Sequence, residues 1–308
     1  MKKVFIDGSA GTTGLRIVER LENRKDIKLI TLADDVRKDI NARKKALNDA
    51  DIAFLCLPDT AAIEAVSLIE NDNTVVIDTS TAHRTNDSFA YGFPELSEEF
   101  EEKIKAGKRI AVPGCHASGV IALIYPLMEK GILNKDVLLS VTSLTGYSGG
   151  GKSMIADYQA DNRNTLLDSP RMYGVTQKHK HLPEIVKICG LSNAPAFMPI
   201  VGDFYSGMEV VIPLFKSWIN GTAEDIKAVY KEKYNGLIVN YVEDFTENGF
   251  VASNKLSFND GMQISVLGND DRILLTARYD NLGKGASGAA IECMNLSIGT
   301  DKTLGLDL

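Results

Sequence analysis

The stretch KKVFIDGSAGTTG at residues 2–14 decides the fold of the amino-terminal part of the chain. Its first half, KKVFID, predicts a short buried strand, and LRIVERLENR after the glycines has the apolar spacing of a helix. Strand, glycine turn and helix in this order are typical of dinucleotide-binding domains, where small residues let the backbone approach a pyrophosphate at a helix N-terminus. The alternative is that the glycines only make a tight turn. We expect the cofactor at Gly8, Ser9, Ala10, Gly11, Thr12, Thr13 and Gly14.

Further apolar runs extend this unit into a sheet. Strands are predicted at residues 27–33, 51–57, 74–78 and 109–112, with helical stretches among them. Short apolar strands that alternate with helices predict a parallel, doubly wound sheet. The fold class is therefore α/β, with a Rossmann-type domain first.

The charged residues that follow the second predicted strand leave the choice between NAD and NADP open. Asp34 and Asp35 stand where an acid would bond the ribose 2′-hydroxyl of NAD, yet Arg37 and Lys38 follow at once and could hold a 2′-phosphate. Arg37 is the residue that we assign to cofactor binding.

Composition narrows the class of protein. The chain has 308 residues with 44% hydrophobic content, enough for about two domains, and its net charge of −7 argues against nucleic-acid and membrane-surface roles. Its amino-terminal apolar stretch is too short for a signal peptide, so we expect a cytoplasmic protein. Four widely spaced cysteines then predict free thiols rather than disulfides.

Cys115 is the candidate nucleophile. It follows a strand and a Pro-Gly turn in VPGCHASG, and a helix is predicted to begin there. A helix N-terminus stabilises a thiolate, which makes the sulfur a better nucleophile at neutral pH. The alternative, a small buried hydrophobe, is our interpretation of Cys56, Cys189 and Cys293.

A nucleophilic cysteine needs a base, and the chain has four histidines, all in loop-like segments: His83, His116, His179 and His181. His179 and His181 are two residues apart, so they point the same way in an extended chain, and Glu184 is near enough to orient an imidazole. Neither C-x-x-C nor H-E-x-x-H spacing supports a zinc site, so we expect no metal.

The stretch GYSGGGKS at residues 146–153 matches the phosphate-cradling pattern G-x-x-x-x-G-K-[ST]. A true P-loop domain also needs a later strand that ends in a magnesium-binding acid, whereas the best such strand, TVVID, precedes the loop. We therefore expect no ATP chemistry.

These motifs together resemble one family from end to end. GSAGTTG, DTSTAHR, YGFPEL, VPGCHASG, GYSGGGKS, HKHLPEI, FMPIVGDFYSGM and NLGKGASGAA are similar to the short form of N-acetyl-γ-glutamyl-phosphate reductase, and more distantly to aspartate-semialdehyde dehydrogenase. The resemblance implies NADPH-dependent reduction of an acyl phosphate to an aldehyde through a cysteine thioester, in arginine biosynthesis. It assigns proton transfer to His179 or His181 without ranking them.

The resemblance also implies further site residues. A dianionic leaving group asks for cations, for which Arg84 is the first choice, Lys152 the second, and His83 belongs to the same substrate group. The glycine loop then approaches the nicotinamide with Ser148 and Gly149, and Asn281 of NLGKGASG lies near the cofactor. His116 stands where many members have a tyrosine; it would lower the pKa of the thiol or contact solvent.

We expect an NADP-binding domain at residues 1–115, completed by the last helix within 286–308, and a catalytic and oligomerisation domain at 116–285. Strands near 137–145, 208–215, 238–243, 262–267 and 272–279 should form a mixed sheet, with the site in the cleft between the domains. The apolar strands 208–215 and 272–278 favour a homodimer or homotetramer. Two alternatives remain open: an aspartate-semialdehyde dehydrogenase-like enzyme, and a non-catalytic NADP-binding regulator.

Overall fold

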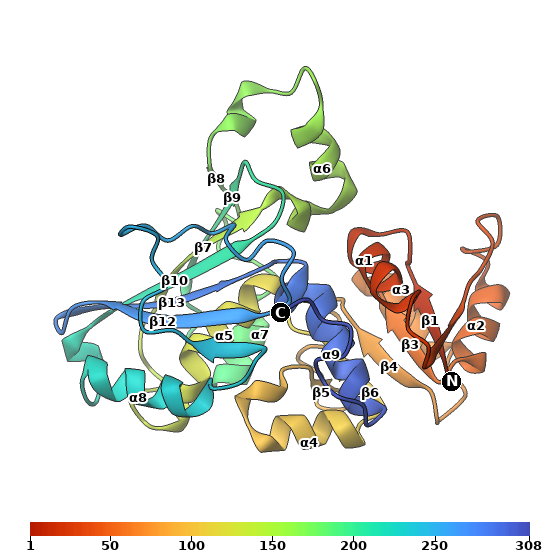
Figure 1. Cartoon of the computed structure of the whole chain (residues 1–308), viewed down its shortest axis with the longest axis horizontal. Coiled ribbons are helices and arrows are strands. Elements are labelled where there is room, and N and C mark those ends of the chain that lie inside the picture. Colours follow the sequence, from red (N-terminus) through yellow and green to blue (C-terminus); the bar gives the residue numbers. More distant parts are fainter. The chain divides into compact units, whose positions relative to one another are not determined.

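The computed structural model describes all residues from 1 to 308, and they divide into two compact units (Figure 1). Unit 1 consists of Met1–Gly114 and Ala286–Leu306, and unit 2 consists of Cys115–Gly285 and Asp307–Leu308. The last two residues join unit 2 through paired bonds, since the Asp260 N–H donates to the Asp307 carbonyl at 2.6 Å and the Asp307 N–H to Asp260 Oδ2 at 3.0 Å.

Unit 1 is built on a six-stranded sheet in the order β2-β1-β3-β4-β6-β5, and every neighbouring pair is parallel. The central strands are buried along their whole length, which explains their nearly continuous apolar sequence. The strands are β1 (Lys2–Asp7), β2 (Ile27–Ile30), β3 (Ile52–Leu55), β4 (Val75–Asp78), β5 (Ala90–Tyr91) and β6 (Arg109–Ala111).

Two apolar clusters cover the two faces of this sheet. One contains residues of α1 (Thr12–Leu21), α4 (Glu98–Ala106) and α9 (Gly288–Ser297), and the other contains residues of α2 (Ile40–Asp49) and α3 (Asp59–Ser67). The returning segment is also tied to the turn after α1 by Arg24, which donates to Asn295 Oδ1 at 2.6 Å and to the Leu304 carbonyl at 3.2 Å. Unit 1 is therefore completed by residues from the far end of the chain.

Unit 2 contains a seven-stranded mixed sheet in the order β11-β12-β13-β10-β7-β9-β8. The long antiparallel pair of β10 and β13 lies at its centre, with Met208 opposite Tyr279 at one end and Phe215 opposite Arg272 at the other. The strands are β7 (Ser140–Gly146), β8 (Arg171–Met172), β9 (Ala196–Gly202), β10 (Met208–Phe215), β11 (Val239–Tyr241), β12 (Met262–Gly268) and β13 (Arg272–Tyr279).

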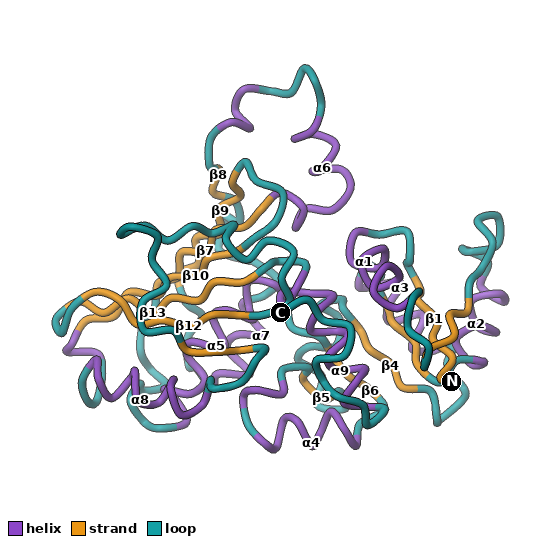
Figure 2. Tube along the Cα trace, in the orientation of Figure 1, coloured by secondary structure: helices purple, strands orange, loops and turns teal.

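Helices α5 (Cys115–Glu129), α7 (Leu182–Cys189) and α8 (Ala223–Lys233) pack together on one side of this sheet (Figure 1). Pro126 lies inside α5 and has no N–H, so the Ala122 carbonyl takes its hydrogen bond from the Tyr234 hydroxyl instead, at 2.7 Å. The tube in Figure 2 shows α6 (Gly151–Gln159) on a long excursion of the chain beyond the sheet. Short helical turns are η1 (Pro94–Leu96), η2 (Tyr147–Gly150), η3 (Thr165–Asp168), η4 (Lys216–Trp218) and η5 (Gly283–Ser287).

The predicted α/β fold class is confirmed, with a parallel sheet followed by a mixed one. The expected strands of both sheets are present, and the sequence predictions missed β5, β8 and β9. Strand β9 contains Pro199, which lowers the strand signal, yet it pairs with β7 on one side and β8 on the other.

Candidate active site

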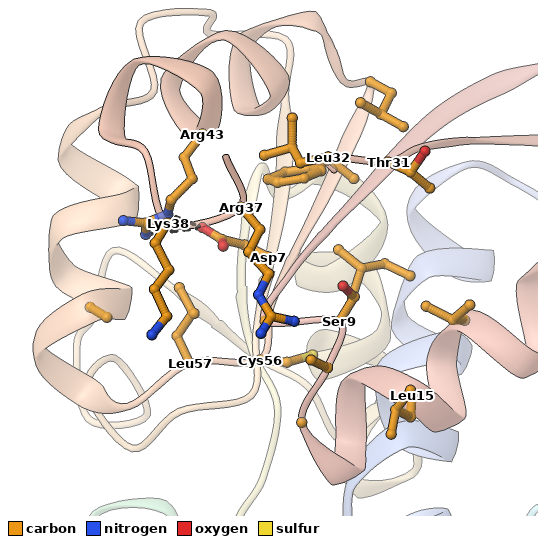
Figure 3. A pocket seen from close by; sticks show the side chains of 18 of the residues that line it. Asp7, Ser9, Leu15, Thr31, Leu32, Arg37, Lys38, Arg43, Cys56 and Leu57 are labelled. Atoms are coloured by element: carbon orange, nitrogen blue, oxygen red, sulfur yellow. Dashed lines mark hydrogen bonds and ion pairs between the residues drawn. The ribbon is translucent and has the colours of Figure 1, made fainter. Parts of the chain in front are cut away.

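The glycine turn of unit 1 forms one side of a cavity of about 660 Å³ (Figure 3). Gly8 has φ of +85°, and a Cβ built on it would lie 2.2 Å from the Cys56 carbonyl oxygen, so only glycine fits there. Helix α1 begins at Thr12 with no acidic residue in its first turn, which leaves its positive end to the cavity. Residues from β1, the glycine turn, the end of β2 and the end of β3 line it, among them Ile6, Ser9, Ala10, Gly11, Leu32 and Leu57.

Basic side chains line the same cavity. Arg43 is fixed there by Asp7, whose Oδ2 lies 3.0 Å from Nη2, and by Glu64, whose Oε2 lies 2.7 Å from Nη1. Arg37 is exposed and pairs at 3.2 Å only with the still more exposed Asp34. Figure 3 shows Arg37 and Lys38 running across the pocket in the same direction. The cavity thus offers two exposed cations, Arg37 and Lys38, to an anionic group, which fits a dinucleotide with an added phosphate.

Cys115 is the first residue of α5, as the Pro-Gly turn predicted, and it is half-buried. Cys189 and Cys293 are buried, and Cys56, although half-buried like Cys115, lies where burial of its thiol raises the pKa to about 12. Cys115 therefore combines partial access with a position at the positive end of a helix.

Three histidine rings cluster at the start of the same helix. The rings of His179 and His181 are 4.7 Å apart, and each lies 5.7 Å from the ring of His116, which directly follows the cysteine. Phe197 packs against the rings of His116 and His179 at 5.4 and 5.0 Å. The sequence predicted the pair from HKH but gave no sign that His116 would join it.

Both expectations for His116 were wrong, and so was its assignment to a loop. It is the second residue of α5, only 2% exposed, with Nδ1 at 2.6 Å from Ser143 Oγ and Nε2 at 2.6 Å from the Tyr173 hydroxyl. Burial, with a smaller effect of His179, lowers the pKa of His116 to about 3. A neutral ring cannot stabilise the thiolate by charge, and a buried one does not meet solvent.

His179 differs from His116 in access. It is half-buried, and burial first, then the charge of Lys180, lowers its pKa. Its Nδ1 accepts a hydrogen bond from the backbone N–H of His181 at 3.2 Å. The neutral ring therefore carries its proton on Nε2.

Glu184 lies in the first turn of α7 and is 1% exposed. Burial first, then the charge of Glu184, raises the pKa of Cys189 on the same helix. The carboxylate therefore lies within electrostatic reach of the far end of α7.

The glycine loop and the NLGKGASG segment meet in unit 2. Asn281 donates from Nδ2 to Ser148 Oγ at 2.9 Å and accepts at Oδ1 from the Gly207 N–H, also at 2.9 Å. A Cβ on Gly149 would lie 3.5 Å from the same Asn281 nitrogen. Lys152 follows in the first turn of α6, where it is exposed.

The predicted substrate residues of unit 1 are both held by neighbours. Arg84 donates from Nε to the Val112 carbonyl and from Nη2 to the Thr79 carbonyl, each at 2.8 Å. His83 Nδ1 lies 2.6 Å from Asp78 Oδ2, and its ring stacks on Phe89 at 4.3 Å.

Sequence reasoning missed several residues of the site: Asp7, Arg43, Ser143, Tyr173, Phe197 and Tyr279. Each contacts a predicted residue or a wall of the cavity. The strands that carry Asp7, Ser143 and Tyr279 were predicted, but the roles of these residues depend on partners distant in the chain.

Family models match both units. One, described as "Semialdehyde dehydrogenase, NAD binding domain", covers residues 3–105, and another, described as "Semialdehyde dehydrogenase, dimerisation domain", covers residues 115–281. The class of protein that the two sheets and the cysteine helix define is therefore the semialdehyde dehydrogenases.

Two curated relatives resolve the group within that class. The chain is 44% identical to N-acetyl-gamma-glutamyl-phosphate reductase of Chelativorans sp. (strain BNC1), with 96% of this chain and 98% of the relative covered. It is 41% identical to N-acetyl-gamma-glutamyl-phosphate reductase 2 of Nostoc sp. (strain PCC 7120 / SAG 25.82 / UTEX 2576), over 99% of each. The chain belongs to the N-acetyl-γ-glutamyl-phosphate reductase family.

Solved structures share the fold. Aspartate semialdehyde dehydrogenase II of Vibrio cholerae, complexed with ASA, matches with a TM-score of 0.71 and 16% identity over 97% of this chain and 98% of that chain. Aspartate semialdehyde dehydrogenase with NADP from Candida albicans matches with a TM-score of 0.66 and 15% identity over 99% of both. The predicted family, oxidoreductase class and arginine-biosynthesis function are confirmed, and the matched NAD binding domain agrees with the predicted nicotinamide cofactor. None of the helices has the length and apolar character needed to cross a bilayer.

Proposed function

We propose that the chain reduces N-acetyl-γ-glutamyl phosphate to N-acetylglutamate semialdehyde and phosphate, with Cys115 as the nucleophile. The observation that carries the assignment is the half-buried thiol at the first residue of α5, followed on the same helix by His116 of the three-histidine cluster. Tyr173 connects the thiol to the histidine cluster. Its hydroxyl bonds His116, and its pKa is raised first by burial and then by the charge of Cys115.

The reaction proceeds in two parts on the cysteine. The Cys115 thiolate attacks the γ-carbonyl carbon, a C–S bond forms, and the bond from that carbon to the phosphate oxygen breaks. NADPH, which the glycine turn at residues 8–14 would hold, would supply the hydride that reduces the thioester. The thiohemiacetal oxygen takes a proton, and its later loss lets the C–S bond break, which releases the aldehyde and restores the thiolate.

His179 is our choice for that proton. It is more accessible than His181, which is 4% exposed, and its Nε2 carries the proton while Nδ1 is occupied by a backbone N–H. His181 positions it by packing against its ring. On reduction the Nε2–H of His179 gives its proton to the oxygen, and the same nitrogen takes the proton back on collapse.

The remaining predicted residues have supporting roles. We assign the pyrophosphate to residues 8–14, the 2′-phosphate of NADP to Arg37 with Lys38, and the nicotinamide to the Ser148, Gly149 and Asn281 group. Arg84 and Lys152 are the cations for substrate anions, and His83 supports Arg84 by holding its loop to Asp78.

A homo-oligomer is part of the proposal. The face of the second sheet opposite α5 carries partly exposed apolar residues, Val211 and Pro213 on β10 and Leu274 on β13. Such a face is suited to the same face of a second copy. A small-molecule biosynthetic substrate and the net charge of −7 support a cytoplasmic location.

The reverse reaction tests the assignment. NADP reduction is followed by absorbance with N-acetylglutamate semialdehyde and phosphate for wild type, Cys115→Ser and the matched control Cys189→Ser. We expect phosphate-dependent turnover that Cys115→Ser loses by several orders of magnitude and Cys189→Ser keeps. Turnover with aspartate semialdehyde alone would change the substrate, and tight NADP binding without turnover would favour a regulator.

A further inference from the structure

The hydroxyl of Tyr279 bonds both backbone groups of the first turn of α5. It donates to the Cys115 carbonyl at 2.6 Å and accepts from the Gly119 N–H at 3.1 Å. These are the two groups that an α-helix pairs with each other, residue i with residue i+4. The phenol thus holds both ends of the turn that begins with the nucleophile.

The Tyr279 hydroxyl packs closely against the backbone of Gly119. A Cβ built on Gly119 would lie 2.7 Å from the Tyr279 oxygen and 2.7 Å from Val210 Cγ2. Only a residue without a side chain lets the tyrosine reach the turn at this point.

Tyr279 is itself rigidly placed. It is the last residue of β13, fully buried, and pairs with Met208 of β10 and Met262 of β12. The next two residues are also fixed: Asp280 accepts from Ser206 Oγ at 2.7 Å, and Asn281 bonds the Ser148 hydroxyl. The end of the central strand therefore holds the cysteine turn and the glycine loop in one register.

We propose that Tyr279 is a positioning residue for Cys115: it fixes the first turn of α5 to the centre of the sheet and so sets where the sulfur stands. Two other buried tyrosines also bond carbonyls of α5, but not in its first turn. Tyr230 of α8 and Tyr234 directly after that helix donate to the carbonyls of Leu123 and Ala122, at 2.5 and 2.7 Å, in a later turn of α5. They make the same kind of bond without touching the first turn.

This inference rests on Cys115 as the nucleophile, so the experiment separates the two. Tyr279→Phe is compared with Tyr234→Phe, which also removes one buried hydroxyl from an α5 carbonyl. The readouts are kcat and KM of the phosphate-dependent NADP reduction, the pH dependence of Cys115 alkylation by iodoacetamide, and Tm. Cys115→Ser serves as the blank for the other thiols.

We expect Tyr279→Phe to lose roughly tenfold to a hundredfold in kcat with KM within about twofold, because a displacement near 1 Å has effects of that size. Its alkylation profile should move to higher pH, because a looser first turn points fewer N–H groups at the sulfur. Tyr234→Phe should lose Tm while kcat and the alkylation profile stay those of wild type.

A kcat within about twofold of wild type, or an alkylation profile that coincides with it, would overturn the proposal even if Tm falls. If Tyr279→Phe does not fold by circular dichroism, the same criteria apply to Gly119→Ala, whose methyl displaces the hydroxyl while the phenol remains. Activity that survives in Cys115→Ser would instead remove the proposed function, and the alkylation profiles would still report on Tyr279.

Discussion

The ring of His116 lies edge to face against the ring of His179, with centroids 5.7 Å apart and planes at 84°. One ring is buried and bonded at both nitrogens, whereas the other is partly accessible. Two imidazoles in contact thus divide into a neutral structural ring and a ring that can exchange a proton.

The first prediction concerns acid stability. The pKa of His116 is about 3 in the folded chain, well below the ordinary value of 6.5, so the unfolded chain binds one more proton between these limits. Stability should therefore be full above pH 6.5 and fall by about 1.4 kcal/mol per pH unit below it from this group. Urea unfolding of wild type and His116→Gln measures it. The difference between the two should shrink as the pH falls, and a constant difference would contradict the assignment.

The second prediction separates the two remaining histidines. His179→Gln should lower kcat by about 10²-fold or more, the usual size of a lost general acid. His181→Gln should act mainly on Tm, because its ring is buried against the other two. Steady-state kinetics and thermal melts of both variants check this. A larger kcat loss in His181→Gln would exchange the two roles.

The third prediction concerns cofactor choice. Arg37→Ala should weaken NADP binding by roughly 10- to 100-fold, since a hydrogen bond to a charged group contributes about 1.5–3 kcal/mol. NAD affinity should change little, because NAD lacks the 2′-phosphate. Fluorescence titration with both cofactors measures the ratio, with Lys38→Ala as the neighbouring variant. Equal losses for both cofactors would place Arg37 on a shared part of the dinucleotide.

The fourth prediction tests the glycine turn. Gly8→Ala combines a φ of +85° with a contact of 2.2 Å to the Cys56 carbonyl, so we expect a lower Tm and at least tenfold weaker NADP binding. Gly131→Ala is the matched control, since Gly131 of unit 2 also has a positive φ, +69°, but open space where a Cβ would stand. Unchanged NADP affinity in a folded Gly8→Ala variant would argue for a purely structural turn.

The fifth prediction addresses assembly. Val211→Lys puts a charge on the partly exposed face of β10 and should shift the protein toward the monomer in sedimentation velocity. Lys231→Ala, on the opposite side of unit 2 in α8, should leave the assembly unchanged. If both variants match wild type, the interface lies elsewhere.

Local patterns in the sequence predicted the parts of the site that local chemistry determines. The Pro-Gly turn before Cys115 gave the start of α5, and the strand before Gly8 gave the cofactor turn. HKH gave two neighbouring imidazoles. In each case the signal lies within a few residues of the feature.

The rest depends on pairs that are distant in the chain. Asp7 and Arg43 are 36 residues apart, and Tyr279 is 164 residues from Cys115. Hydrogen-bonded pairs of this kind have no periodicity to detect. The burial of His116 was not predicted for the same reason. It depends on contacts with β7 and β9, and Pro199 lowered the strand signal of β9.

The return of the chain into unit 1 also bears on how the protein is made. Helix α9 contributes Ala289, Ile291 and Met294 to the apolar cluster on the first sheet, yet these residues leave the ribosome after all of Cys115–Gly285. At ordinary translation rates that interval is on the order of ten seconds or more. Throughout it, the nascent amino-terminal segment shows the part of the apolar sheet face that α9 later covers, which chaperones that hold nascent chains would recognise.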